Sequence, residues 1–415
     1  MKAFWRQSLL LFVSLRAGDL VTLAAALWFV PRFVSPQDLG AVIPVTSFAT
    51  FLAMPVYGCA LVTMKISADL TGRGLAGQRT ALLRGVFASM ALLLVLSLAG
   101  AAALLPRYLA EMRLSDASVG FFVVAASLLG CFAPVYTDAL QALKRFGTLG
   151  AVEFCGALAR VGVFALVMPL RPLAGYFAGQ ATQPLCRMLG GCTALWRELR
   201  RPPEPFWTPA NVRLAVRLYM GTILYLGLSM AEGLVEQTVL RTGLDAADSA
   251  GYYMVSRFSD FLYLVTIPLL WVMFPHTADA AREGRATRIF VLPASGVTLG
   301  VALLAALVYI PYGENLLALL PNGNAYAACA RFMPVLVLAT GLTSCQVFYT
   351  NAELSAGRFG FLLWFAPLNL GAIAFLFAAR GFFSSLDRLT GFMLATAVLR
   401  ALCAGLALFA QKDKQ

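Results

Sequence analysis

The feature that most constrains the fold is a series of long apolar runs separated by short polar connections. A helix needs about 20 mainly apolar residues to cross a hydrocarbon core about 30 Å thick. The 415-residue chain holds about twelve such segments. They are expected near Leu9–Phe33, Leu39–Met64, Ala81–Leu105, Val119–Leu143, Leu149–Met168, Leu173–Leu195, Leu214–Leu240, Ala250–Phe274, Ile289–Ile310, Ala328–Ala352, Phe361–Ala379 and Leu389–Ala410. With 60% hydrophobic and 13% charged residues, against about 25% charged in soluble domains, the sequence predicts an all-α polytopic membrane protein.

The connections differ in their content of basic residues. If both termini lie on one side, that side carries about eighteen Lys and Arg and the other about seven. Because basic connections stay in the cytoplasm, we expect both termini there. The first apolar run looks like a signal peptide, but it resumes after Arg16–Asp19 without a convincing cleavage site, so we interpret it as an uncleaved first helix. The net charge of +12 then reflects orientation and contact with membrane lipids, and no nucleic-acid partner is expected.

The two halves of the chain resemble each other. Residues 136–147 and 349–360 are identical at six of twelve positions, and the openings 35–40 and 246–251 align at nearly the same shift. Chance likeness among low-complexity helices is the alternative. A repeat of six spans inserts both halves in one direction, related by a pseudo-two-fold axis along the membrane normal. We therefore predict two six-helix lobes, residues 1–200 and 201–415, with a substrate path between them.

Ionisable residues lie well inside several predicted spans. Arg16 and Asp19, like Arg257 and Asp260, are three residues apart and share a helix face. Each buried ion costs several kcal/mol in hydrocarbon, so these groups should face a polar cavity or each other. Either a central polar cavity or a set of structural salt bridges explains them. The candidate substrate-binding cations are Arg16, Arg257, Arg160 and Arg217. The candidate ion-coupling or salt-bridge carboxylates are Asp19, Asp260, Glu232, Glu236, Glu153 and Asp138.

Other chemistries find little support. The eight cysteines fall in apolar stretches without a C-x-x-C pair, which favours free thiols packed as small hydrophobic residues. The single histidine, His276, argues against a histidine-based metal site, so no metal and no cofactor is expected. The chain has no G-x-x-x-x-G-K-[ST] sequence, which argues against ATP coupling within it.

Several stretches resemble one transporter family. The openings at 35–51 and 247–261, the latter with a Gly251–Tyr252 pair followed by Arg257, resemble those of Wzx-type polysaccharide flippases. The stretches 267–275, 324–336 and 349–360 are also similar to that family. It belongs to the multidrug, oligosaccharidyl-lipid and polysaccharide exporter superfamily.

The resemblance implies a flippase that moves a polyprenyl pyrophosphate-linked oligosaccharide from the cytoplasmic to the outer leaflet. Such a protein would work in the bacterial inner membrane, for O-antigen, capsule or exopolysaccharide synthesis. It would use a V-shaped cavity, alternating access and a proton or sodium gradient, with Arg16 and Arg257 meeting the pyrophosphate. A glycan polymerase and glycosyltransferases are the implied partners, and we expect a monomer that is not an enzyme.

Three alternatives stay open. Residues 68–74 partly match the D-x-x-G-R loop of major facilitator transporters, with Gly74 in place of the second basic residue. A drug or small-cation exporter of the same superfamily would favour an acidic, aromatic cavity. A membrane-embedded glycan polymerase or ligase usually carries a large periplasmic loop, whereas the longest connection here, Trp196–Arg213, is short.

Overall fold

The computed structural model describes residues 2–112 and 119–410, and all regular structure in these ranges is helical. The first half contains α1 (Lys2–Phe33), α2 (Pro36–Gly72), α3 (Ala76–Glu111), α4 (Val119–Ala142), α5 (Phe146–Val167) and α6 (Pro172–Leu199). The second half contains α7 (Pro209–Gly243), α8 (Ala246–Asp260), α9 (Tyr263–Arg282), α10 (Arg288–Ala318), the 3-10 helix η1 (Gly323–Phe332), α11 (Met333–Ser355), α12 (Leu362–Ala378), the 3-10 helix η2 (Arg380–Phe383) and α13 (Leu386–Phe409).

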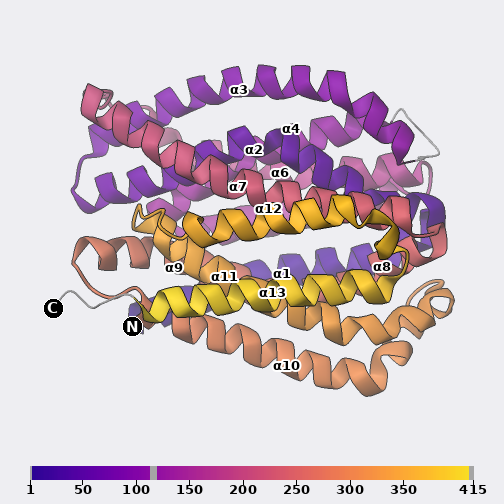
Figure 1. Cartoon of the computed structure of the whole chain (residues 1–415). Helices are drawn as coiled ribbons and strands as arrows, with labels where there is room; N and C mark the ends of the chain where they lie inside the picture. Colours follow the sequence, from indigo (N-terminus) through magenta and orange to yellow (C-terminus); the bar gives the residue numbers. More distant parts are fainter. Residues whose placement is uncertain (1, 113–118, 411–415) are drawn as a thin grey trace.

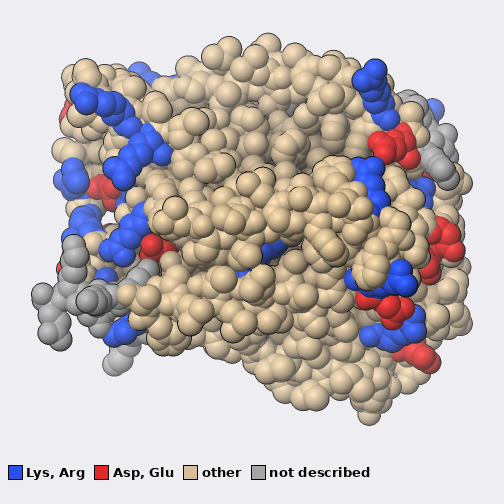
Figure 2. All heavy atoms as spheres, in the orientation of Figure 1, with Lys and Arg blue, Asp and Glu red and all other residues tan. Residues whose placement is uncertain are grey.

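All twelve predicted segments are helical, which confirms the predicted fold class. In the described residues, eight helical segments meet length and composition criteria for crossing a membrane. The helix α6 falls outside this set because it carries Gln180, Gln183 and Arg187 in its middle. Charged side chains gather at the two ends of the bundle, with a mainly uncharged band between them (Figure 2). This distribution is the one a membrane-spanning bundle requires.

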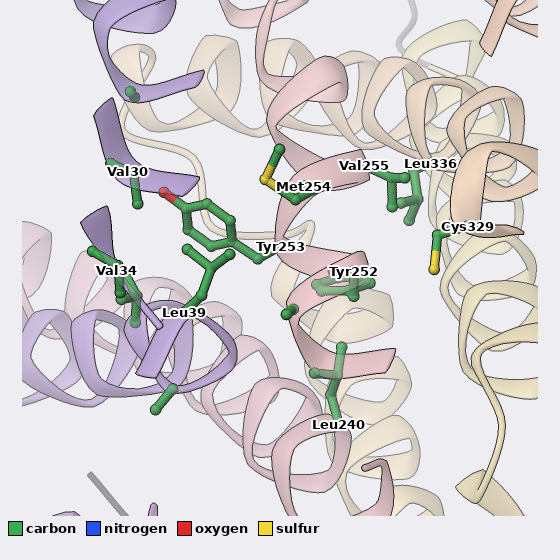
Figure 3. Packing of buried hydrophobic residues seen from close by; sticks show 14 of the residues in the cluster. Val30, Val34, Leu39, Leu240, Tyr252, Tyr253, Met254, Val255, Cys329 and Leu336 are labelled. Atoms are coloured by element: carbon green, nitrogen blue, oxygen red, sulfur yellow. The ribbon is translucent and has the colours of Figure 1, made fainter. Parts of the chain in front are cut away.

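The helices form two lobes. Helices α1–α6 pack mainly among themselves, as do α7–α13, and α2 joins the lobes by packing on α7, α8 and α9. Helix α1 also packs on α9 across the interface. The start of α1 and the end of α13 lie at the same end of the bundle (Figure 1), which we call the terminal end. An apolar cluster joins the lobes toward the opposite end, where Tyr253 of α8 points toward Val30, Val34 and Leu39 (Figure 3).

The internal repeat recurs in the geometry of the turns. Lys144 after α4 and Gly357 after α11 lie 213 positions apart, and both have left-handed backbones, with φ of 54° and 70°. In each turn the left-handed residue and its successor donate to carbonyls three and five residues back, which is the Schellman arrangement. Gly74 and Gly284 end α2 and α9 in the same way. The two halves therefore repeat in three dimensions as well as in sequence.

The predicted eighth span is interrupted. The sequence predicted one segment over Ala250–Phe274, but α8 ends at Asp260 and α9 begins at Tyr263. The amides of Leu264 and Val265 donate to carbonyls three residues back, at 2.9 and 3.0 Å. Pro268 lies inside α9, where it has no amide hydrogen to donate to the carbonyl of Leu264. The break follows directly after the Arg257–Asp260 pair.

Candidate functional site

The main candidate site is a cavity between the two lobes, which we call the inter-lobe cavity. Its volume is about 400 Å³. The lining residues are Val42, Ile43, Thr46, Ser47, Thr50, Arg160, Tyr176, Gln180, Met230, Gly233, Leu234 and Arg257. Two of the four predicted cations thus lie on one cavity, Arg160 from α5 and Arg257 from α8.

Two further cavities adjoin this one. The N-lobe cavity, about 210 Å³ between α2, α4 and α6, shares Thr46, Thr50 and Gln180 with it. The C-lobe cavity, about 380 Å³, shares Ile43, Gly233 and Arg257 with it. Because neighbouring cavities share lining residues, the three form a chain of spaces across both lobes.

The first lobe holds a cluster of charged groups near the inter-lobe cavity. The buried Arg16 pairs with Asp19 at 2.8 Å, and Glu153 is bound by Arg187 of α6 at 2.6 Å. Arg160 and Arg187 both act electrostatically on Asp19. The cluster joins α1, α5 and α6 and contains one more guanidinium than carboxylate.

Arg160 accounts for the excess positive charge. It donates to Gln183 at 3.1 Å and lies over the Phe164 ring at 5.3 Å. It makes no ion pair with any carboxylate of the described residues. Its Nε is buried without a hydrogen-bond partner in the described structure. A guanidinium with an unused donor on a cavity wall is suited to bind an anion, because a buried charge is stabilised only when it is paired.

Arg257 lies at the junction of the inter-lobe and C-lobe cavities. It pairs with Asp260 at 2.8 Å and lies over the ring of Tyr253 at 4.9 Å. Its Nε, like that of Arg160, has no hydrogen-bond partner within the described ranges. Arg257 therefore lines both cavities while it is paired with Asp260.

The C-lobe cavity is acidic. Glu232 is bound by Arg400 of α13 with its side chain only 5% exposed, whereas Glu236, one turn further along α7, makes no ion pair in the described part of the chain. With Asp260 paired to Arg257, the cavity has three carboxylates and two guanidiniums. Glu236 is thus the carboxyl that is best placed to take up a cation.

The structure separates the other predicted residues from these cavities. Arg217 is exposed on α7 and lines none of the three. Asp138 is buried in α4 and lines none of them either. Arg331 lies in the predicted span Ala328–Ala352. Its side chain is 67% exposed and forms an ion pair of 2.8 Å with Asp387 in the first turn of α13.

Sequence reasoning also missed two charged residues. Arg187 lies in α6 beside Gln180 and Gln183, and Arg400 is a charged residue within the apolar run of α13. In each case the usable signal was a lone cation inside a predicted span. A basic side chain is visible at the bottom of a hollow between α12 and α13 (Figure 2), the region in which Arg400 of α13 lines the C-lobe cavity.

Comparison with known proteins gives a fold and no family. No family sequence model matches the chain, and no curated protein sequence is significantly similar to it. A multidrug resistance MATE family transporter of the MOP superfamily, in its inward-facing conformation, matches at a TM-score of 0.68 and 13% identity, covering 96% of this chain and 98% of that one. The outward-facing conformation of such a transporter matches at 0.67 and 13%, covering 100% and 97%. The Vibrio cholerae MATE transporter VcmN, in its bent form, matches at 0.64 and 16%, covering 98% and 96%.

These matches extend over nearly the whole chain, so its fold is that of the MATE transporters. At 13% and 16% identity they show the fold alone and do not single out a polysaccharide flippase.

Proposed function

We propose that this chain is a secondary transporter that exposes the inter-lobe cavity alternately to the two sides of the membrane. The observation that carries the proposal is the presence of Arg160 and Arg257, one from each lobe, on the wall of one cavity. A site formed by both lobes is remodelled when they move relative to each other, which is what alternating access requires. The solved structures that share the fold include inward-facing and outward-facing transporters.

The charge of the cavity favours a substrate with an anionic group. Two guanidiniums with unused buried donors match the geometry of phosphate oxygens, which Arg binds with paired hydrogen bonds. This supports a flippase for a polyprenyl pyrophosphate-linked oligosaccharide, as the sequence stretches suggested. In this proposal the pyrophosphate contacts Arg160 and Arg257, and a proton or sodium ion binds near Glu236. The chain would then act as a monomer in a bacterial inner membrane with both termini cytoplasmic, beside a glycan polymerase and glycosyltransferases.

An exporter of small organic molecules is the second candidate. The solved structures of similar fold include multidrug transporters, one of them in complex with R6G. In the C-lobe cavity, Glu236 lies with the rings of Tyr252 and Tyr263, an acidic and aromatic lining that suits a cation. The comparisons favour this alternative, whereas the paired arginines favour the flippase. The MATE-like fold does not support a major facilitator, and the three solved structures described above are transporters.

A reconstituted system tests the proposal. Purified protein in liposomes receives a fluorescent polyprenyl pyrophosphate-linked oligosaccharide, and a membrane-impermeant quencher reports its movement between leaflets. Loss of one charge-assisted hydrogen bond costs about 1.5–3 kcal/mol, so Arg160→Gln and Arg257→Gln should each slow flipping about 10-fold or more. Arg217→Gln is the matched control, because that arginine is exposed outside the cavities, and it should flip at the wild-type rate.

The same liposomes test the second candidate with a fluorescent organic cation under an imposed proton or sodium gradient. Gradient-driven cation transport, together with lipid flipping that Arg160→Gln and Arg257→Gln leave unchanged, would refute the flippase and favour the exporter.

A further inference from the structure

We propose that the N-lobe cavity binds an uncharged, hydroxyl-rich group, the sugar that adjoins the phosphates of the substrate. This inference rests on the proposed function, because it needs an anionic group held at Arg160 and Arg257. The cavity lies between α2, α4 and α6, and its lining includes Thr46, Thr50 and Gln180.

The described residues that line the N-lobe cavity carry no charge. Among the described residues that form it there is no Asp, Glu, Lys or Arg, although both neighbouring charged regions lie in the same bundle. The described lining therefore offers no carboxylate to pair with a cationic drug and no guanidinium to pair with a phosphate. A lipid tail would leave the amide of Gln180 without a partner, which is costly inside a membrane protein. The ligand that fits is neutral and polar.

The polar groups have unused hydrogen-bonding capacity. The hydroxyls of Thr46 and Thr50 donate to the carbonyls of Val42 and Thr46, each at 2.8 Å, so their lone pairs can still accept. The amide of Gln180 makes no hydrogen bond with the described residues and can both donate and accept. A sugar hydroxyl is donor and acceptor in one group, which matches this mixed set.

Apolar surface completes the wall. Phe177 and Tyr57 line the cavity together with Pro184 and Ala53. A pyranose ring has an apolar C–H face as well as hydroxyl edges, so it can pack on aromatic side chains while its hydroxyls reach the polar ones. A wall of both kinds is typical of a ligand pocket in which a few polar groups fix orientation.

The position of the cavity gives the order of the substrate groups. Thr46, Thr50 and Gln180 line both this cavity and the inter-lobe cavity that holds Arg160. A ligand whose phosphates lie at the arginines therefore has its next group at the boundary formed by these three residues. In a lipid-linked oligosaccharide that group is the first sugar.

Binding to two synthetic lipids tests the inference. Purified protein is titrated with farnesyl pyrophosphate and with farnesyl pyrophosphate carrying one hexose, and Kd is measured by microscale thermophoresis. Wild type should bind the glycosylated lipid about 10-fold more tightly, as expected for a few hydrogen bonds to neutral groups. Gln180→Leu and Thr50→Val should each reduce that preference about 3-fold or more, because they weaken binding of the glycosylated lipid more than binding of farnesyl pyrophosphate.

Two variants control the experiment. Thr63→Val removes a buried hydroxyl of α2. Like the hydroxyl of Thr50, it donates to a carbonyl four residues back, at 2.7 Å, but Thr63 lines none of the three cavities. It should keep the wild-type preference. Arg160→Gln should weaken both lipids equally.

The outcomes separate the two levels of the proposal. Equal affinity of wild type for both lipids, or a loss in Gln180→Leu that is the same for both, overturns the sugar site alone. Failure of both lipids to bind, or insensitivity of both to Arg160→Gln, refutes the proposed function together with the sugar site.

Discussion

Replacing Arg400 with glutamine should destabilise the second lobe strongly. Arg400 of α13 binds Glu232 of α7, and their side chains are 13% and 5% exposed. The substitution leaves the Glu232 carboxylate buried without its cation. Removing one partner of a buried pair typically costs about 3–5 kcal/mol, most of it the penalty of the remaining charge. For a unit of about 200 residues, each kcal/mol lowers Tm by about 2–4 °C, so we expect a loss of roughly 6–20 °C.

The assay is thermal unfolding in detergent, followed by tryptophan fluorescence. The double variant Glu232→Gln with Arg400→Gln removes both charges and leaves two amides that can bond to each other, so it should recover most of the loss. Arg331→Gln is the matched control. Arg331 makes an ion pair of 2.8 Å with Asp387, but the two side chains are 67% and 61% exposed. Such exposed pairs contribute about 0–1 kcal/mol, so its Tm should fall by about 0–4 °C.

Two results would contradict the assignment of Arg400 and Glu232 as a buried ion pair. One is a Tm of Arg400→Gln no lower than that of Arg331→Gln. The other is a double variant as unstable as the single one, because the loss would then come from packing of the long side chain.

Three further predictions concern transport. If Arg257 binds substrate as proposed, Arg257→Gln should impair flipping even when combined with Asp260→Asn; recovery of transport in the double variant would instead show a structural salt bridge. Glu236→Gln should remove the dependence of transport on the ion gradient while substrate affinity stays within about twofold, measured as flipping with and without a gradient. Lys144→Gln breaks an inter-lobe ion pair with Asp279 at 2.9 Å near the terminal end. An impermeant thiol reagent added at that end should therefore label a cysteine introduced into the inter-lobe cavity up to about 5-fold faster; an unchanged rate would show that this pair does not hold the lobes together.

Part of the architecture follows from local features of the chain. The twelve segments, the position of the connections and the repeat between residues 136–147 and 349–360 are set by the length of apolar runs and by turn chemistry. Lys144 and Gly357 end equivalent helices in the same conformation, because the same local hydrogen bonds close both turns. Such features depend on neighbours in the chain, so they are visible in the sequence.

The composition of the site could be predicted only in part. Arg160 and Arg257 were singled out as charges inside spans, and so was Arg217. A membrane-facing helix is apolar on nearly every side, so the sequence pattern does not reveal which face turns inward. Arg217 consequently looked equivalent to the other two, although it is exposed on α7.

By itself, the sequence determined an all-helical membrane protein with two repeated halves and charges buried in its spans. The requirement to satisfy every backbone group inside a bilayer leaves helices as the solution for long apolar runs, so this level needs no knowledge of packing. The tertiary structure decided which charges meet. Arg400 binds Glu232 across 168 residues, and Arg160 and Arg257 reach one cavity from different lobes. These pairings follow from helix rotation and lobe contact, which depend on contacts between residues distant in the chain.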